Sequence, residues 1–358
     1  MDELSVDIIS NIFLRIPIKS LLRLRAVSKS WCKIIDDPFY AHLHYHCGEA
    51  EQETPVIIPE FTVSRKAVSL YAACDNEEDS TIHAGKIPMA KFEVKDSFGG
   101  SCNGLMYLAE FRGARIVMLN PLRNQFKILP SMSIENYCPE SKKAYGLGFD
   151  TLTKTFKMVC TIYEASTRPC TLVHTLGTTS WIEISKVPFP YLIYGEPVFL
   201  HGFLHWMAEP CSATEICEGR IMAFDVSKET FKLIPHPEIC LDKDRGLFRV
   251  LDIAGNLAMF DLSYNTKIDI WVMDYEKKIW NREYTISITT PLPDHELTQV
   301  IGTWKQDEIL LANSQGYFSY SMKTGDLKYK HNMGFSSSEQ VYRHRGSLIS
   351  ISDVMEVV

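Results

Sequence analysis

The first forty-odd residues alternate apolar and polar side chains with the period of an amphipathic α-helix. Isoleucines and a phenylalanine recur three or four positions apart between Leu4 and Ile16, which places them on one face of a helix. Ser5 is a suitable N-cap for this helix. Pro17 ends it, because proline lacks a backbone N–H and disfavours helical geometry at the residue before it.

Two further short helices are predicted before residue 38. An aliphatic run follows Ser20, and Ser28 can cap a third helix that carries Trp31 and stops at residues 36–38. Helices this short bury too little surface to form an independent core. Their remaining apolar face must lie either against the rest of this chain or against the helices of a partner, and the pattern alone leaves both interpretations open.

After residue 55 the pattern changes to β-branched and aromatic runs separated by Gly, Pro, Asn and Asp turns. Residues 47–55 are acidic and end in proline, which predicts a linker. A residue before a tight turn is repeatedly followed, six positions later, by a large apolar one. Each such pair predicts a hairpin whose second strand starts with a core side chain. The pairs are Asn120 and Phe126, Asp150 and Phe156, Thr175 and Trp181, Asp225 and Phe231, Asp274 and Trp280, and Ser321 and Leu327.

These hairpins recur with a regular period. Without the pair at Asp150, the intervals between successive pairs are 55, 50, 49 and 47 residues, and a four-stranded repeat of this length is typical of kelch-like β-propeller blades. The fold class predicted is therefore a small all-α module at residues 1–46 followed by an all-β propeller at residues 56–358. We expect about six blades, with five or seven as alternatives. A final strand at 341–351 is expected to pair with the first strands and close the ring.

Composition and charge narrow the functional classes. The 358 residues carry a formal net charge of −7, which argues against nucleic-acid binding, since phosphate neutralisation needs a basic surface. Apolar runs stay below the ~18 residues that span a membrane, and the N-terminus is acidic where a secretion signal would be positive. The ten cysteines contain no C-x-x-C pair, so disulfides and a zinc ribbon are not expected. A reduced cytoplasmic or nuclear location fits best.

Residues with catalytic or metal-binding chemistry form no recognisable motif. The G-x-S-x-G, H-E-x-x-H and phosphate-loop patterns are absent. His42 and His46 would share a helix face without further ligands, so we expect a solvated module boundary there instead of a metal site. His201 and His205 alternate on one strand face and are expected to be packing residues. No catalytic residue, metal or cofactor is predicted.

The N-terminal residues resemble an F-box. The matching features are the aliphatic and acidic start at 4–9, the block 12–17, the run 21–31 and the closing Asp-Pro-Phe at 37–39, while Ser5 stands where the family usually has proline. The resemblance implies binding to a Skp-family adaptor and, through it, to the cullin and RING subunits of a ubiquitin ligase. The residues expected to bind the adaptor are Leu4, Ile8, Ile9, Ile12, Leu14, Ile16, Pro17, Leu21, Leu24, Val27 and Trp31.

The β-rich part resembles the F-box-associated domain of plant F-box proteins. The matching stretches include GSCNGLMYL at 100–108, LNPLRNQFKILP at 119–130, YGLGFDTLTKTFKMV at 145–159 and IMAFDVSKETFKLIPHP at 221–237. Both resemblances together imply a non-catalytic substrate receptor. Because the strands of a blade alternate in direction, the tight hairpins share one face of the propeller and the longer loops share the opposite face, where we expect a protein substrate to bind. The alternative is a propeller enzyme or small-molecule sensor with its ligand at the central channel. Individual substrate contacts are not predicted.

Overall fold

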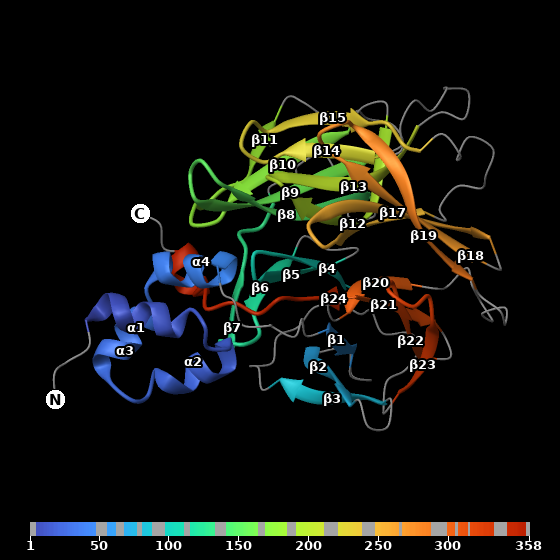
Figure 1. The fold of residues 1–358 in the computed structure, drawn as a ribbon. Helices are drawn as coiled ribbons and strands as arrows, with labels where there is room; N and C mark the ends of the chain where they lie inside the picture. Colours follow the sequence, from blue (N-terminus) through green and yellow to red (C-terminus); the bar gives the residue numbers. More distant parts are fainter. Residues whose placement is uncertain are drawn as a thin grey trace.

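Four short helices precede an array of β-strands in the computed structural model of the chain (Figure 1). The structure describes residues 5–47, 56–61, 68–76, 81–87, 97–110, 115–132, 141–163, 169–184, 191–210, 221–237, 248–264, 267–287, 299–304, 307–313, 316–332 and 342–355. Within these ranges, none of the helices combines the length and the apolar character needed to cross a membrane.

The N-terminal helices are α1 (Val6–Phe13), α2 (Ile18–Leu24), α3 (Lys29–Ile35) and α4 (Pro38–Cys47). The two predicted serine caps are confirmed: Ser5 Oγ accepts the backbone N–H of Ile8 at 3.4 Å, and Ser28 Oγ accepts that of Trp31 at 3.1 Å. Such bonds satisfy donors that the first helical turn leaves unpaired. The second helix begins directly after Pro17, which is its N-cap, and not after Ser20 as the sequence suggested.

Hydrogen bonding gathers the strands into five sheets. Four of the sheets contain four antiparallel strands each, in an order that follows or reverses the sequence. Their strands are β4 (Ser97–Cys102), β5 (Leu105–Glu110), β6 (Ile116–Asn120) and β7 (Gln125–Ile128); β8 (Lys142–Asp150), β9 (Thr155–Tyr163), β10 (Cys170–Thr175) and β11 (Ile182–Ile184); β12 (Tyr191–Leu200), β13 (Phe203–Pro210), β14 (Ile221–Asp225) and β15 (Thr230–Ile234); and β16 (Phe248–Ile253), β17 (Asn256–Tyr264), β18 (Lys267–Asp274) and β19 (Ile279–Ser287).

The fifth sheet has eight strands in the order β20-β21-β22-β23-β3-β2-β1-β24. Its strands are β20 (Gln299–Trp304), β21 (Glu308–Asn313), β22 (Gly316–Ser321), β23 (Leu327–Asn332), β3 (Thr81–Ile87), β2 (Val68–Asn76), β1 (Val56–Phe61) and β24 (Tyr342–Arg343). Strands β23 and β3 pair in parallel at only two positions, whereas the other pairs are antiparallel. A propeller is thus observed, but five sheets do not confirm the expected number of about six blades.

The predicted ring closure is confirmed, although the closing strand is much shorter than expected. β24 pairs with β1 through Tyr342 and Arg343 only. Residues 344–350 leave the sheet, and Ile351–Met355 forms helix α5, so the expectation of a strand over 341–351 is wrong. The innermost strands β24, β4, β8, β12, β16 and β20 are successive neighbours around a closed ring.

All six predicted hairpins are antiparallel strand pairs, although Phe156 alone of their six large apolar residues is fully buried and the others are partly exposed. In four of the hairpins the first residue caps its own turn. The side chains of Asn120, Asp150, Asp225 and Asp274 each accept the backbone N–H groups two and three residues further on, at 2.9–3.4 Å. Asx turns of this kind fix the chain reversal locally. The fourth residue after each cap has a left-handed backbone, with φ of 53–58° at Asn124, Lys154, Glu229 and Lys278.

Candidate partner-binding site

The N-terminal helices expose large aliphatic side chains to solvent. The exposed fractions are 62% for Val6, 48% for Ile8, 47% for Ile12 and 62% for Val27. Apolar side chains gathered on one small module typically mark a protein interaction surface. Ile8 and Ile12 lie one turn apart on the same side of α1, whereas Val6 points to another side of that helix. We call these four exposed residues together the exposed helical face. Three of them were predicted from the sequence, and Val6 was missed because it lies off the helical stripe of the isoleucines.

The other predicted contact residues are covered to different degrees. Pro17 is exposed, and Leu4 lies outside the described residues. A partly buried group packs against the hydrophobic core; it comprises Ile9, Leu14, Ile16, Leu24 and Trp31. Leu21 is completely buried. It therefore packs in the core of this chain, and its predicted adaptor contact is not supported by exposure of its side chain. Conversely, Phe39 is 78% exposed although the sequence analysis did not include it among the contacts.

The buried side of the same helices packs on the propeller. Phe13, Ile18, Leu21 and Ile35 share one continuous hydrophobic cluster with strand residues such as Leu105. The first interpretation, packing on the rest of this chain, is therefore confirmed for one face of the module, and contact with a partner stays a prediction for the exposed side chains. One face of the module is covered by this chain, and the exposed helical face is not.

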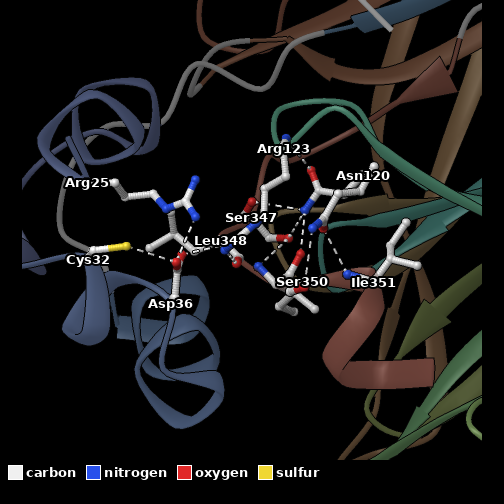
Figure 2. Close-up of polar contacts among 11 residues, drawn as sticks. Arg25, Cys32, Asp36, Asn120, Arg123, Ser347, Leu348, Ser350 and Ile351 are labelled. Carbon is white, nitrogen blue, oxygen red and sulfur yellow. Dashed lines mark hydrogen bonds and ion pairs between the residues drawn. The ribbon is translucent and has the colours of Figure 1, made fainter. Parts of the chain in front are cut away.

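A polar junction centred on Asp36 joins the helices to the propeller (Figure 2). Asp36 Oδ2 accepts Arg25 Nη2 at 2.7 Å, and its Oδ1 accepts Arg123 Nη2 at 2.8 Å. The thiol of Cys32 also donates to Oδ2, at 3.3 Å. Arg123 comes from the β6–β7 turn and its side chain is only 6% exposed; it also donates to the carbonyl of Leu348. One carboxylate thus connects two helices, a propeller turn and the C-terminal segment.

The electrostatics of this junction favour the charged carboxylate. Partial burial alone would raise the pKa of Asp36, but the hydrogen bonds from Arg25, Cys32 and Arg123 outweigh it and lower the pKa below its ordinary value. Hydrogen bonds between ionised groups are stronger than neutral ones, and a guanidinium is suited to bonding a carboxylate in a fixed orientation. The junction should therefore stay ionised at neutral pH.

The C-terminal segment 344–355 lies between the helices and the propeller and is held by the same turn. The Nδ2 of Asn120 donates to the carbonyls of Ser347 and Ile349 at 3.1 and 2.8 Å, while its Oδ1 caps the β6–β7 turn. Ser347 Oγ donates to the carbonyl of Gly104 at 2.9 Å. Gly104 has φ of +79°, and a Cβ there would lie 2.1 Å from Ser347 Cβ. Only glycine permits this close approach.

The two histidines of the β12–β13 hairpin, His201 and His205, have different surroundings. His205 is buried and its Nδ1 donates to the carbonyl of Val198 at 3.2 Å, as expected for a packing residue. His201 instead lies exposed in the β12–β13 turn, with Nε2 3.1 Å from the carbonyl oxygen of Gly255. Among the described residues, no three His, Cys, Asp or Glu side chains converge as metal ligands would.

The helices contact the end of the propeller that carries the tight turns. Leu122 and Arg123 lie in the β6–β7 turn, and Gly104 lies in the β4–β5 turn. Because strands in each sheet alternate in direction, the longer connections lie at the other end. Most of those connections, on which substrate recognition was predicted, fall outside the described residues. The predicted substrate face thus stays a prediction.

Comparison with known proteins defines the class of this chain. Residues 1–41 match the F-box domain, and residues 61–330 match the F-box associated beta propeller domain. The chain therefore belongs to the F-box proteins that carry this associated propeller. An F-box domain implies a Skp-type adaptor as a partner.

The particular relatives are plant proteins of Arabidopsis thaliana. F-box protein CPR1 is 28% identical over 315 residues, which cover 80% of this chain and 73% of that protein. F-box/kelch-repeat protein At3g23880 is 23% identical over 366 residues, covering 98% and 97%. F-box protein At3g07870 is 26% identical over 339 residues, covering 86% and 78%.

Proposed function

We propose that this chain is the non-catalytic substrate-receptor subunit of a Skp–cullin–F-box ubiquitin ligase, acting in the cytoplasm or nucleus. The observation that carries the proposal is the exposed helical face of Val6, Ile8, Ile12 and Val27. These side chains stay open although the opposite side of the same helices is packed on the propeller. A module that had only a structural role would be expected to bury both sides.

The proposed mechanism is positional. The adaptor covers the exposed helical face and links the chain to cullin and RING subunits, while the far end of the propeller binds a protein substrate. Ubiquitination is then accelerated because the substrate is held near the loaded enzyme, which raises its effective concentration. The Asp36 junction supports this role, since it fixes the orientation of the helices relative to the substrate-binding end.

We further propose that the eight-stranded sheet comprises two blades, which would give six in total. Two features support this count. Strands β20–β23 and the set β24, β1, β2 and β3 each form a four-stranded antiparallel unit, and only two residue pairs join them. Moreover, six innermost strands surround the centre.

The test of the proposed function removes the exposed helical face without disturbing the fold. Ile8→Asp combined with Ile12→Asp places two charges where an apolar partner surface would have to desolvate them. The double variant should lose co-purification with a Skp-family adaptor while its circular dichroism and thermal unfolding match the wild type. The matched control combines Ile182→Asp with Ile279→Asp, two exposed isoleucines on the outer strands β11 and β19, and should bind normally. Normal adaptor binding by the Ile8/Ile12 variant would refute the proposal.

A further inference from the structure

Two adjoining cavities lie where α4, the β8–β9 hairpin and the C-terminal segment meet. The smaller one has a volume of about 240 Å³, and the larger and more open one about 470 Å³. Both are lined by Pro38, His42 and Lys154, so they form one continuous depression, which we call the junction groove. None of its lining residues belongs to the exposed helical face, and the proposed adaptor contact leaves the groove unexplained.

The smaller cavity has aromatic and aliphatic walls. Phe149 and Phe156 pack edge to face with ring centroids 4.9 Å apart, and the ring of His42 lies 4.8 Å from Phe149 in the same manner. Ile349 and Val354 of the C-terminal segment complete the apolar lining. A small, partly open space with aromatic walls and a few polar groups at its edge is typical of sites for flat organic ligands.

The polar groups where the cavities join are hydrogen-bond donors. Lys154, in the β8–β9 turn, makes no hydrogen bond or ion pair with any described residue. By contrast, Lys157 of the same hairpin contacts Asp150 and Glu229 at 3.1 and 2.8 Å. An ammonium without a partner among the described residues can donate a hydrogen bond to an anionic group. The desolvation cost is small, because the ammonium remains partly hydrated.

The charged groups that act on His46, at the edge of the groove, are positive. Burial lowers the pKa of His46, and the positive charges of Arg345 and Lys154 together with the imidazole of His42 lower it further. The groups around this histidine therefore disfavour an additional proton, and an anion would relieve that repulsion. Asp353 also lines the smaller cavity and is the one opposing charge among its lining residues.

We propose that the junction groove binds a small organic anion. Its flat apolar part occupies the 240 Å³ cavity between Phe149, Phe156 and the C-terminal segment. Its acidic group lies at the shared mouth, where it accepts hydrogen bonds from His42 and Lys154. Such a ligand contacts α4, the propeller and the C-terminal segment at once, so it stabilises the arrangement of the two modules.

The test uses the full-length chain and 2-naphthoate as the probe, measured by isothermal titration calorimetry. The neutral isostere 2-naphthamide reports on the charge of the ligand. Lys154→Asn removes the ammonium, and Lys278→Asn is the matched control, because Lys278 is exposed at the same position of the β18–β19 turn with φ of 56° against 58°. Asparagine tolerates this left-handed backbone, so both variants should keep the wild-type melting temperature.

The expected result is saturable binding of 2-naphthoate at one site. Lys154→Asn should weaken it by about tenfold, as expected for the loss of one hydrogen bond to a charged group, and Lys278→Asn should leave it unchanged. The amide should bind more weakly than the acid, and Asp353→Asn should tighten binding of the acid. The proposal is overturned if 2-naphthoate does not saturate the protein, if Lys154→Asn and Lys278→Asn behave alike, or if the amide binds equally well. None of these measurements depends on adaptor binding, so the proposed ligand site and the proposed receptor function can be refuted independently.

Discussion

The junction at Asp36 gives the sharpest stability prediction, because one carboxylate accepts two arginines from different parts of the chain. We consider Asp36→Asn, which keeps the shape of the side chain and one acceptor oxygen but removes the charge. Arg123 would then keep its bond to the carbonyl of Leu348 while its ionic partner is lost. The side chain of Arg123 is only 6% exposed, so water can replace the carboxylate only in part.

The size of the effect follows from this geometry. A hydrogen bond to a charged group contributes about 1.5–3 kcal/mol, and breaking a fully buried ion pair costs about 3–5 kcal/mol. The carboxylate of Asp36 is 30% exposed, which screens the interaction and places the expected loss at about 2 kcal/mol. The variant should therefore unfold at a measurably lower urea concentration.

The assay is a double-mutant cycle of urea unfolding with Asp36→Asn, Arg123→Met and the combined variant. We expect a coupling energy of about 1–2 kcal/mol between the two residues. Asp274→Asn is the control, since Asp274 caps an equivalent propeller turn and its ionic partner among the described residues is the exposed Lys277. It should leave the unfolding midpoint unchanged. Additive effects at positions 36 and 123 would show that the ion pair does not join the modules.

The same variant has a pH signature with a definite sign. Burial opposes ionisation of Asp36, but hydrogen bonds from Arg25, Cys32 and Arg123 lower its pKa in the folded protein. Its stabilisation is then fully present above the pKa of the unfolded chain, about 3.9, and is lost as the pH falls through the lower folded pKa. Wild type and Asp36→Asn should differ at pH 7 and converge in acid. An equal difference at all pH values would contradict the assigned charge.

Two further predictions concern the C-terminal segment and the substrate end. Gly104→Ala should lower the free energy of unfolding by about 2–4 kcal/mol, from backbone strain plus the clash with Ser347. Gly255→Ala is the control, at φ of +82° with open space around it, and should lower it by only about 1–2 kcal/mol. Equal losses in urea unfolding would show that the clash makes no contribution. Exchanging the connections 211–220 or 288–298 for those of a relative should change which proteins are captured and leave adaptor binding intact. Unchanged capture, or lost adaptor binding, would reject the assignment of the substrate face.

The hairpins could be predicted from the sequence because their cause is local. An Asn or Asp caps the turn that follows it, and a large apolar residue six positions later is the second residue of the next strand, so the signal and the structure occupy the same short stretch. The serine caps of α1 and α3 were predictable for the same reason. In these places the identity of one residue is sufficient to fix the backbone around it.

The features that sequence reasoning missed depend on contacts between distant residues. In the sequence, Arg123 has the pattern of a solvated turn residue. Its ionic partner Asp36 lies 87 positions away, so no local signal indicates the pair. Residues 344–355 alternate apolar and polar side chains like a strand, but packing against the helices and β7 turns their end into α5. Leu21 matched the family contact pattern, and only the docked propeller shows that it is core. Tertiary context decided each of these cases.

The placement of the C-terminal segment has a consequence for engineering such receptors. A chimaera that exchanges the propeller alone treats the N-terminal helices and the propeller as independent units. Here residues 344–355 pack between the helices and the propeller. Asn120 and Arg123 hold this segment by donating hydrogen bonds to its backbone carbonyls. A chimaera that keeps this arrangement should therefore include the N-terminal helices, the β6–β7 turn and residues 344–355 together, although these segments lie far apart in the sequence.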